Sequence, residues 1–301
     1  MADRSVTVLG EEHGKAWSIY NADAVDFARQ LPDESVDFAV FSPPFGDLFV
    51  YSDSAADMGN SSSSGEFFEH YGYLVREMFR VIRPGRLVAV HCSDLPMRKW
   101  ITGHVALSPF SDEITACHRA AGWLLHSRVT VWKDPVVEMQ RTKALGLLYK
   151  QIQKDSSMSR TGMPDYLLVF RKPGDNAAPI EHKPADFPVG MWQKWASPVW
   201  MDIDQTNVLN GRIAREDRDE KHICPLQLDL IERAITLWSN PGETVWSPFT
   251  GIGSEGYQAV RLGRRFVGTE LKQSYWRTAC RYLAEAEREV SMPSLLDALV
   301  V

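Results

Sequence analysis

The most constraining feature of this 301-residue sequence is a strand–turn–helix–strand pattern near its C-terminus. Residues 244–249 read as a strand, residues 254–262 as a helix and residues 265–270 as a second strand. Two strands joined by a crossover helix lie parallel in one sheet. Together with the strands and helices that alternate earlier in the chain, this pattern predicts a doubly wound α/β fold, in which helices cover both faces of a mostly parallel sheet.

The first strand of this unit ends in a glycine-rich turn, Phe249-Thr-Gly251-Ile-Gly253-Ser-Glu-Gly256. Glycines permit a tight turn and the close approach of a ligand to the backbone. Glu270 follows Gly251 by nineteen residues, at the end of the next strand. An acid at that offset can hydrogen-bond both ribose hydroxyls of an adenosine. The pattern predicts nucleoside binding, although a plain tight turn or an NAD site would satisfy it as well.

Strands and helices also alternate in the rest of the sequence, as apolar runs and apolar residues at helical spacing indicate. The predicted strands are 36–41, 87–90, 124–132 and 166–170, and the predicted helices are 24–30, 66–82, 112–121, 226–238 and 274–287. Arg83-Pro84-Gly85 is expected to end the helix that precedes it. Residues 133–164 and 172–218 break the alternation, so either stretch could be an accessory module.

A second motif, Ser42-Pro43-Pro44-Phe45, follows the strand at 36–41 directly. Ligand crevices in such sheets lie beyond the carboxyl ends of the strands. The two prolines fix the backbone and remove two N–H donors, which leaves carbonyl acceptors, a hydroxyl and an aromatic face. The Ser42 hydroxyl and the Pro43 carbonyl could each accept an N–H bond from the exocyclic amino group of a base, while Phe45 stacks on that base. On its own, the motif favours a rigid strand-ending turn with Phe45 as a core aromatic, and only together with the glycine turn does it favour a catalytic site.

An amino group held in this way has its lone pair localised on nitrogen and can attack a sulfonium methyl group in line. The protein then supplies positioning and electrostatics, and neither a metal nor a covalent intermediate is needed. The base must leave the duplex stack to reach such a pocket, so base flipping is implied. The loop at residues 46–65 is rich in Ser, Asp and Gly and is expected to close over the flipped base.

Together the two motifs resemble those of the β-class amino-methyltransferases of DNA, the permuted group in which the catalytic motif precedes the cofactor motif. Ser42-Pro43-Pro44-Phe45 looks like the catalytic motif, and the glycine turn looks like the cofactor motif, with Ser247 in place of the usual Asp. The resemblance implies S-adenosylmethionine as the cofactor and DNA as the partner. It also implies a Rossmann-like methyltransferase sheet with a small target-recognition insertion. The whole chain further resembles phage or prophage methyltransferases.

The resemblance also assigns residues to the site. The catalytic residues would be Ser42, Pro43, Pro44 and Phe45, and the cofactor-binding residues would be Asp23, His222, Pro225, Gln227, Phe249, Thr250, Gly251, Gly253 and Glu270. Asp23 belongs to a segment that resembles one near the cofactor adenine, and residues 222–227 loosely resemble a cofactor-side motif. The serine form of the catalytic motif accompanies N4-cytosine methylation more often than N6-adenine methylation, so cytosine N4 is the favoured target.

The motif order also suggests how the chain is divided. Residues 1–132 would form the catalytic half of the core, residues 133–220 an insertion and target-recognition region with a core strand near 166–171, and residues 221–301 the half that binds S-adenosylmethionine. The insertion contains a basic stretch that suits phosphate contacts, although a solvated helix face is an equal alternative: Arg141, Lys143, Lys150, Lys154 and Arg160. Its tryptophans, Trp192, Trp195 and Trp200, are expected to be packing anchors more than base stackers.

The composition sets limits on the partners. A net charge of −6 argues mildly against nucleic acid, but a local basic surface can bind phosphates on an acidic protein. The four cysteines are widely spread without a Cys-x-x-Cys pair, so neither disulfides nor a metal site is expected. No stretch approaches the length of a membrane span, which predicts a cytoplasmic protein. Dimers are common in the resembling family, so a homodimer is compatible with the sequence.

Three alternatives to a DNA methyltransferase stay open on the residues alone. An NAD-dependent oxidoreductase would use the same glycine turn, but it gives no role to residues 42–45. A non-catalytic nucleic-acid-binding module would retain DNA without methyl transfer. An amino group of RNA or of a protein is a further class of substrate.

Overall fold

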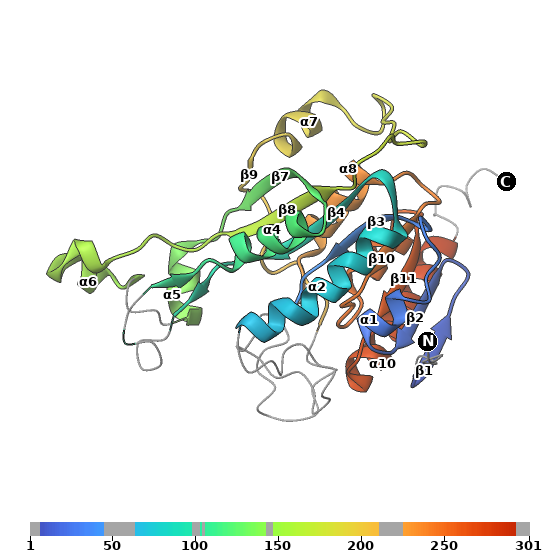
Figure 1. Cartoon of the computed structure of the whole chain (residues 1–301). Helices are drawn as coiled ribbons and strands as arrows, with labels where there is room; N and C mark the ends of the chain where they lie inside the picture. The colour runs from blue at the N-terminus through green and yellow to red at the C-terminus, as the bar shows by residue number, and fades with distance from the viewer. Residues whose placement is uncertain are drawn as a thin grey trace.

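The computed structural model describes residues 7–44, 64–97, 103, 106–142, 147–210 and 225–292, and of residues 64, 141 and 142 it describes the backbone only. The N-terminal elements are β1 (Gly10–His13), β2 (Trp17–Asn21), α1 (Ala24–Ala28), β3 (Val36–Phe41), α2 (Ser64–Val81), β4 (Ile82–Cys92), β5 (Leu95–Pro96), β6 (Leu107–Ser108), α4 (Phe110–Ala120) and β7 (Leu124–Val131). They are followed by α5 (Pro135–Thr142), α6 (Tyr149–Lys154), η4 (Ser156–Met158), β8 (Asp165–Arg171), α7 (Val189–Trp195), β9 (Val199–Trp200), α8 (Leu228–Trp238), β10 (Thr244–Ser247), α9 (Ser254–Arg261), β11 (Arg265–Thr269) and α10 (Gln273–Ser291) (Figure 1).

One large sheet organises the molecule, with the strand order β1-β2-β11-β10-β3-β4-β8-β7-β9 among the described residues. The strands β2, β11, β10, β3 and β4 are mutually parallel. The strand β8 is antiparallel to both of its neighbours, β4 and β7, and β1 is antiparallel to β2 at the edge. The predicted doubly wound, mostly parallel α/β sheet is therefore confirmed.

Alternate residues of each central strand face two separate cores, because side chains in a strand point to opposite faces of the sheet. On β3, Phe38 and Val40 pack into a cluster with apolar residues of α8, α9 and α10. Ala39 and Phe41 pack into the second cluster, with residues of α1, α2 and α4. The helices therefore form one layer on each face, and all six residues of β3 are buried.

The order in which successive strands are added to the sheet reverses between β10 and β3. From β10 the chain passes through α9 to β11 on one side, and from β3 it passes through α2 to β4 on the other side. These two strands are parallel neighbours, with Val245 opposite Phe38 and Trp246 opposite Ala39. Crevices in open α/β sheets form at such a reversal, outside the carboxyl ends of the strands. By this rule a binding crevice is expected where residues 42–44 and 248–253 follow their strands.

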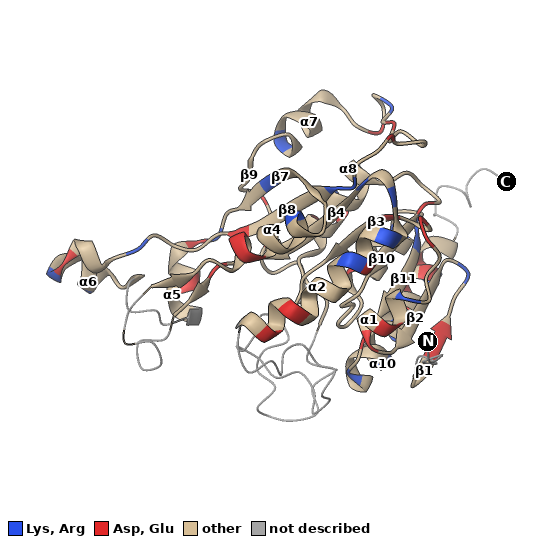
Figure 2. Ribbon diagram, in the orientation of Figure 1, with Lys and Arg blue, Asp and Glu red and all other residues tan. Residues whose placement is uncertain are grey.

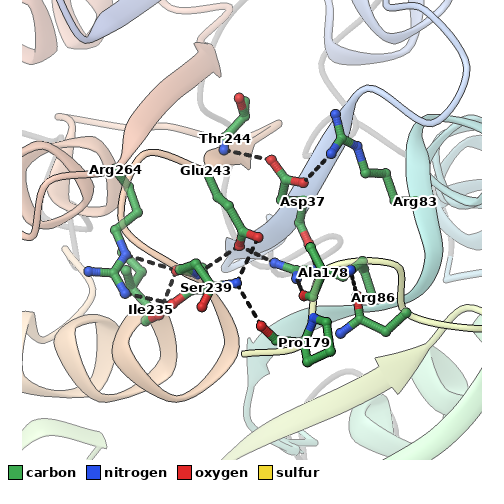
Figure 3. A network of polar contacts seen from close by, with 12 residues as sticks. Asp37, Arg83, Arg86, Ala178, Pro179, Ile235, Ser239, Glu243, Thr244 and Arg264 are labelled. Atoms are coloured by element: carbon green, nitrogen blue, oxygen red, sulfur yellow. Dashed lines mark hydrogen bonds and ion pairs between the residues drawn. The ribbon is translucent and has the colours of Figure 1, made fainter. Parts of the chain in front are cut away.

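The amino ends of β3, β4 and β10 are held by a buried polar network (Figure 3). The Asp37 carboxylate accepts a hydrogen bond from the Thr244 N–H at 2.8 Å and pairs with Arg83 at 3.0 Å. Arg86 is only 2% exposed and forms an ion pair with Glu243. Because residues 37 and 243–244 come from distant parts of the sequence, these contacts fix the register between the two central strands.

The helix α2 ends at Val81, just before Arg83-Pro84-Gly85, as predicted. The strand β4 begins at Ile82, earlier than the predicted strand at 87–90, and its first part is irregular, with Gly85 at a φ of +74°. This segment is held from both sides: Ile82 pairs with Val36, and the Gly85 N–H donates to the Lys172 carbonyl at 3.0 Å. A register shift in the pairing of β3 with β4 accommodates the irregular segment.

Five strands among the described residues were not predicted: β1, β2, β5, β6 and β9. All of them are short, and the buried residues of β2 alternate over only five positions, Trp17, Ile19 and Asn21. The strand β2 pairs with β11, so part of the segment expected to belong to the catalytic half lies beside the glycine-turn unit.

Residues 133–142 and 147–164, the described part of the segment 133–164, form an arm that leaves the sheet between β7 and β8 (Figure 1). The strand β7 is parallel to β4, because both are antiparallel to β8. The arm therefore starts at the carboxyl edge of the sheet, the edge at which residues 42–44 and 248–253 follow their strands. Its helix α6 buries none of its side chains.

Candidate active site at the sheet reversal

The two predicted motifs meet at the carboxyl ends of β3 and β10. The ring of Phe41, the last residue of β3, lies 5.8 Å from the ring of Phe249 in the glycine-turn motif. Pro43 is buried, and Ser42 and Pro44 are half-buried. Phe45 lies outside the described residues, as does almost all of the loop at 46–65 that was expected to close over a base.

The glycine turn is shaped by two residues in the left-handed region, Gly251 with φ +54° and Gly253 with φ +100°. A Cβ on Gly253 would lie 3.0 Å from Cα of Ala279, so a side chain there would collide with α10. A Cβ on Gly251 would meet nothing within 4 Å. The turn is therefore packed on one side and open on the other, which suits the close approach of a ligand to Gly251.

Glu270 lies against the open side of the turn. Its Oε2 accepts a hydrogen bond from the Gly251 N–H at 2.8 Å, and its Oε1 accepts one from the Lys272 N–H at 2.9 Å. The Asn21 amide donates to the carbonyls of Glu270 and Leu271, both at 2.8 Å. These contacts hold a half-buried carboxylate in a fixed position beside the turn.

Two buried polar groups near the turn were not predicted. The Ser247 Oγ at the end of β10 is buried and has no hydrogen-bond partner among the described residues. Glu255 is 4% exposed in the first turn of α9. Burial raises the pKa of its carboxyl group to about 8, and the nearby negative charge of Glu270 adds to this increase. The only signal in the sequence was an acid inside the glycine motif.

Ser42 begins a chain of polar side chains from three further segments. Its Oγ lies 3.1 Å from Nδ1 of His91 on β4 and 3.2 Å from the His91 carbonyl oxygen. His91 Nε2 lies 3.2 Å from Oδ2 of Asp165, at ion-pair distance but without the geometry of an aligned hydrogen bond. The other Asp165 oxygen pairs with Lys133. His91 and Asp165 are buried.

The Asp165 carboxylate is charged in this chain of contacts. Burial alone would raise its pKa, but His91 and Lys133 outweigh burial and lower the pKa to about 2. Sequence reasoning missed all three residues, because no motif connects Ser42 with a histidine 49 positions later.

Comparison with known proteins identifies the family. Residues 36–281 match the family model described as DNA methylase, of the N6/N4 type. The chain belongs to the N6/N4 DNA methylase family. It is 26% identical over 272 residues to DNA adenine methyltransferase YhdJ of Escherichia coli (strain K12), a match that covers 89% of this chain and 83% of that protein. It is 22% identical to type II methyltransferase M.BglII of Bacillus subtilis, over 92% of this chain and 72% of that protein.

Solved structures show the same fold. The DNA modification methylase TTHA0409 of Thermus thermophilus, complexed with S-adenosyl-L-methionine, matches with a TM-score of 0.63 and 22% identity, over 88% of this chain and 93% of that chain. The cytosine-N4-specific PvuII DNA methyltransferase matches with a TM-score of 0.64 and 14% identity, over 94% of this chain and 96% of that chain. These likenesses confirm the Rossmann-like methyltransferase sheet.

Within this DNA methylase, Thr250 and Asp23 make local contacts. The Thr250 Oγ1 donates to the Ser247 carbonyl at 3.2 Å, and its N–H donates to the Thr269 carbonyl at 2.9 Å, which joins the turn to β11. Asp23 caps α1, because its Oδ1 accepts from the N–H groups of Val25 and Asp26. Burial raises the Asp23 pKa.

Of the predicted cofactor residues 222–227, Pro225 and Gln227 lie just before α8 and His222 lies outside the described residues. The Gln227 amide contacts the Gln205 amide at 3.1 Å. The Gln258 amide on α9 donates to the Leu228 carbonyl at 3.0 Å, which ties the start of α8 to α9.

The predicted basic residues differ in their surroundings. Lys150 and Lys154 are exposed on α6, and Figure 2 shows basic residues on α6 and on the chain that returns from it. Arg160 instead pairs with the buried Glu138 of α5 at 3.1 Å, a contact within the arm. Lys143 and the Arg141 side chain lie outside the described residues.

The tryptophans of the 172–210 segment have structural contacts. Trp200 is buried, and the Arg233 guanidinium lies 4.7 Å from its ring centroid and 5.2 Å from that of Trp195. These two residues are therefore packing anchors, as predicted. Trp192 is 56% exposed.

Two further observations concern the described residues only. No three His, Cys, Asp or Glu side chains among them are grouped as a metal site. None of their helices has the length and apolar character required to cross a membrane.

Proposed function

We propose that this chain is a permuted, S-adenosylmethionine-dependent DNA methyltransferase that methylates an exocyclic amino group of a flipped base. The observation that carries the proposal is the meeting of the Ser42-Pro43-Pro44 corner with the glycine turn at neighbouring strand ends. The 5.8 Å between the rings of Phe41 and Phe249 supports this closeness. A methyl donor and an acceptor held in these two places would be close enough to react.

The residues of the crevice fit the proposed cofactor. Glu270 would accept hydrogen bonds from the ribose hydroxyls, because its carboxylate is held beside Gly251 and has several acceptor positions. The open space over Gly251 would admit the nucleoside. The Ser247 Oγ, unpaired among the described residues, would find a polar partner on the ligand. Asp23, at the end of the neighbouring β2, would lie toward the adenine. When bound, the cofactor supplies an activated methyl group.

Ser42 and Pro43 would bind the target amino group. The lone pair of an exocyclic amino nitrogen is delocalised into the base, so the nitrogen is a weak nucleophile. Two acceptors, the Ser42 hydroxyl oxygen and the Pro43 carbonyl, would draw the N–H bonds out of the base plane and localise that lone pair. Because Pro43 is buried and conformationally fixed, both acceptors are positioned before the base arrives.

Cytosine N4 is the proposed target, in preference to adenine N6. The serine form of the catalytic motif supports this choice. The similar proteins include both target types: YhdJ is named an adenine methyltransferase, and the PvuII enzyme is named cytosine-N4-specific. The target base is therefore a matter for direct measurement.

The arm at residues 133–164 would hold the DNA. It leaves the sheet at the edge that contains the crevice, and its helix α6 exposes Lys150 and Lys154. Tyr149 and Ile152 on the same helix are also exposed, at 73% and 50%. A helix that buries none of its side chains, but carries basic and aromatic ones, suits contacts with a phosphate backbone.

The enzyme would modify specific DNA sequences in the cytoplasm, as the type II name of one relative suggests. A homodimer would place two arms around one duplex. Sedimentation with and without DNA would test this assembly.

The decisive experiment is incubation with DNA and labelled S-adenosylmethionine, followed by mass spectrometry of the nucleosides. We expect labelled N4-methylcytidine in its deoxy form. Labelled N6-methyladenine would correct the base only, whereas the absence of label in any base would contradict the proposed function. Thermal shifts should show stabilisation by S-adenosylhomocysteine and none by NAD.

A further inference from the structure

The polar chain that begins at Ser42 has a use in the proposed reaction. Transfer of a methyl group to an amino nitrogen leaves that nitrogen with one proton too many, so the site needs a proton acceptor. Ser42 is the residue placed to contact the amino group, but a serine hydroxyl is a poor base by itself. We propose that His91, held by Asp165, receives this proton through Ser42. The inference rests on the function proposed above.

The contacts of Ser42 determine which atoms face the substrate. Both polar neighbours of its Oγ are acceptors: the His91 carbonyl at 3.2 Å, and the His91 Nδ1 at 3.1 Å when that nitrogen carries no proton. The single hydroxyl proton is therefore donated inward, and the oxygen lone pairs remain for an incoming N–H. A serine with this arrangement acts as an acceptor toward the base.

Asp165 influences the protonation of the imidazole through its charge. Its carboxylate lies 3.2 Å from Nε2, and this nearby negative charge favours a proton on Nε2 and a lone pair on Nδ1. The pKa of Asp165 is lowered to about 2, so it stays charged at working pH. A buried carboxylate in this place also stabilises the imidazolium that forms when Nδ1 accepts a proton.

The bonds and electrons balance as follows. The sulfur–methyl bond of the donor breaks with its electron pair kept on sulfur, and the nitrogen lone pair forms the new nitrogen–carbon bond. One N–H bond then breaks, and its electrons return to nitrogen. That proton passes to the Ser42 Oγ while the Ser42 proton passes to His91 Nδ1. His91 is left as an imidazolium beside Asp165 and later releases the proton to water.

Other charged groups surround the relay. Lys133, which follows β7, pairs with Asp165 and offsets part of its negative charge. Cys92 follows His91 on β4, and its pKa is raised above its ordinary value by burial and by Asp165, so it stays a neutral thiol. Asp94, on the chain after β4, raises the Cys92 pKa further. These neighbours leave His91 as the proton acceptor that lies between Ser42 and Asp165.

The test is the single-turnover rate of methyl transfer as a function of pH for His91→Asn. An asparagine can still hydrogen-bond Ser42 but cannot take up the proton. We expect the wild-type rate to fall on the acid side, because a protonated Nδ1 cannot accept. In His91→Asn we expect a rate about 100-fold lower without that acid limb, while the Kd for S-adenosylmethionine changes less than about threefold.

The matched control is His126→Asn. His126 Nδ1 also lies 3.1 Å from a serine hydroxyl, that of Ser127, but on the exposed surface of β7. This variant should keep both the rate and the acid limb. A His91→Asn enzyme that keeps the limb, or transfers within about threefold of wild type, would overturn the relay.

Asp165→Asn provides a second test if His91→Asn does not fold. Loss of the carboxylate should lower the rate and move the acid limb to lower pH, because the imidazolium loses its counter-charge; an unmoved limb would overturn the proposal. If the wild-type protein methylates no DNA, the proposed function itself has failed, and this result is distinct from a failure of the relay alone.

Discussion

Pro43 follows the buried strand β3, at the place where the target base is proposed to bind. Its ring restricts the backbone and so helps to hold the Pro43 carbonyl in one position. Pro43→Ala restores an N–H donor and frees the backbone, so we expect the rate of methyl transfer to fall about 100-fold or more. The Kd for S-adenosylmethionine should stay nearly unchanged, since the proposed cofactor-binding residues follow the other strand, β10. Single-turnover transfer and equilibrium binding measure the two quantities.

Pro32→Ala is the control for this prediction, because Pro32 is an exposed turn residue before β3. It should leave both quantities unchanged. Equal loss of cofactor affinity and transfer rate in Pro43→Ala would contradict the division of roles between the two strand ends.

Glu255 makes stability depend on pH. Its pKa is about 8 in the folded protein against an ordinary value of 4.5, so between these pH values the folded state binds more protons than the unfolded state. Stability is therefore lost as the pH rises through this range. Glu255→Gln removes the effect, and we expect the variant to gain on wild type progressively from pH 5 to pH 8, by up to ~3 kcal/mol near pH 7.

Chemical denaturation at a series of pH values measures this difference in free energy of unfolding. Glu285→Gln, at an exposed site on α10, should give a difference that does not vary with pH. A constant difference for Glu255→Gln as well would show that Glu255 is ionised in the folded state throughout.

The helix α6 buries none of its side chains and exposes Lys150 and Lys154 on the arm that leaves the carboxyl edge of the sheet. If its lysines contact phosphates, Lys150→Ala with Lys154→Ala should weaken DNA binding and reduce the slope of log K against log salt concentration by about 2. Titrations of a labelled duplex at several salt concentrations give the slope.

Lys183→Ala is the matched control, because that exposed lysine lies two residues from Glu181, which contacts Asn240 at the opposite edge of the sheet. Its slope should equal that of wild type. An unchanged slope in the double variant would exclude α6 from the DNA interface.

The strands β3 and β10 are joined at both of their ends. The two motifs meet at the carboxyl ends, and the buried ion network lies at the amino ends. Glu243→Ala would leave the Arg86 guanidinium buried without its carboxylate. We expect a loss of about 3 kcal/mol or more in free energy of unfolding, measured by urea denaturation.

Asp26→Ala removes a half-exposed pair with Arg29 and should cost less than about 1 kcal/mol. A Glu243→Ala cost as small as this would mean that hydrophobic packing alone sets the register of the two strands.

The sequence by itself determined the elements and the two motifs. The strand Val36–Phe41 has the predicted bounds, and the glycine turn lies between a strand and a helix as expected. These features depend on neighbours a few residues apart: apolar periodicity, proline and glycine backbone limits, and the short crossover that makes two strands parallel. The same local information placed the end of α2 correctly but not the start of β4, because pairing with strands distant in sequence extends β4 back to Ile82.

Only the tertiary structure decided which side chains surround Ser42. His91 is 49 residues away from it, and Asp165 and Lys133 lie farther along the chain, on strands whose order in the sheet no local pattern specifies. The same holds for β2 beside β11 and for Glu255, whose pKa depends on burial by elements packed around it. Local chemistry fixes what a segment can become, whereas charge and proton affinity at a site depend on long-range packing, which brings distant groups together and excludes water from them.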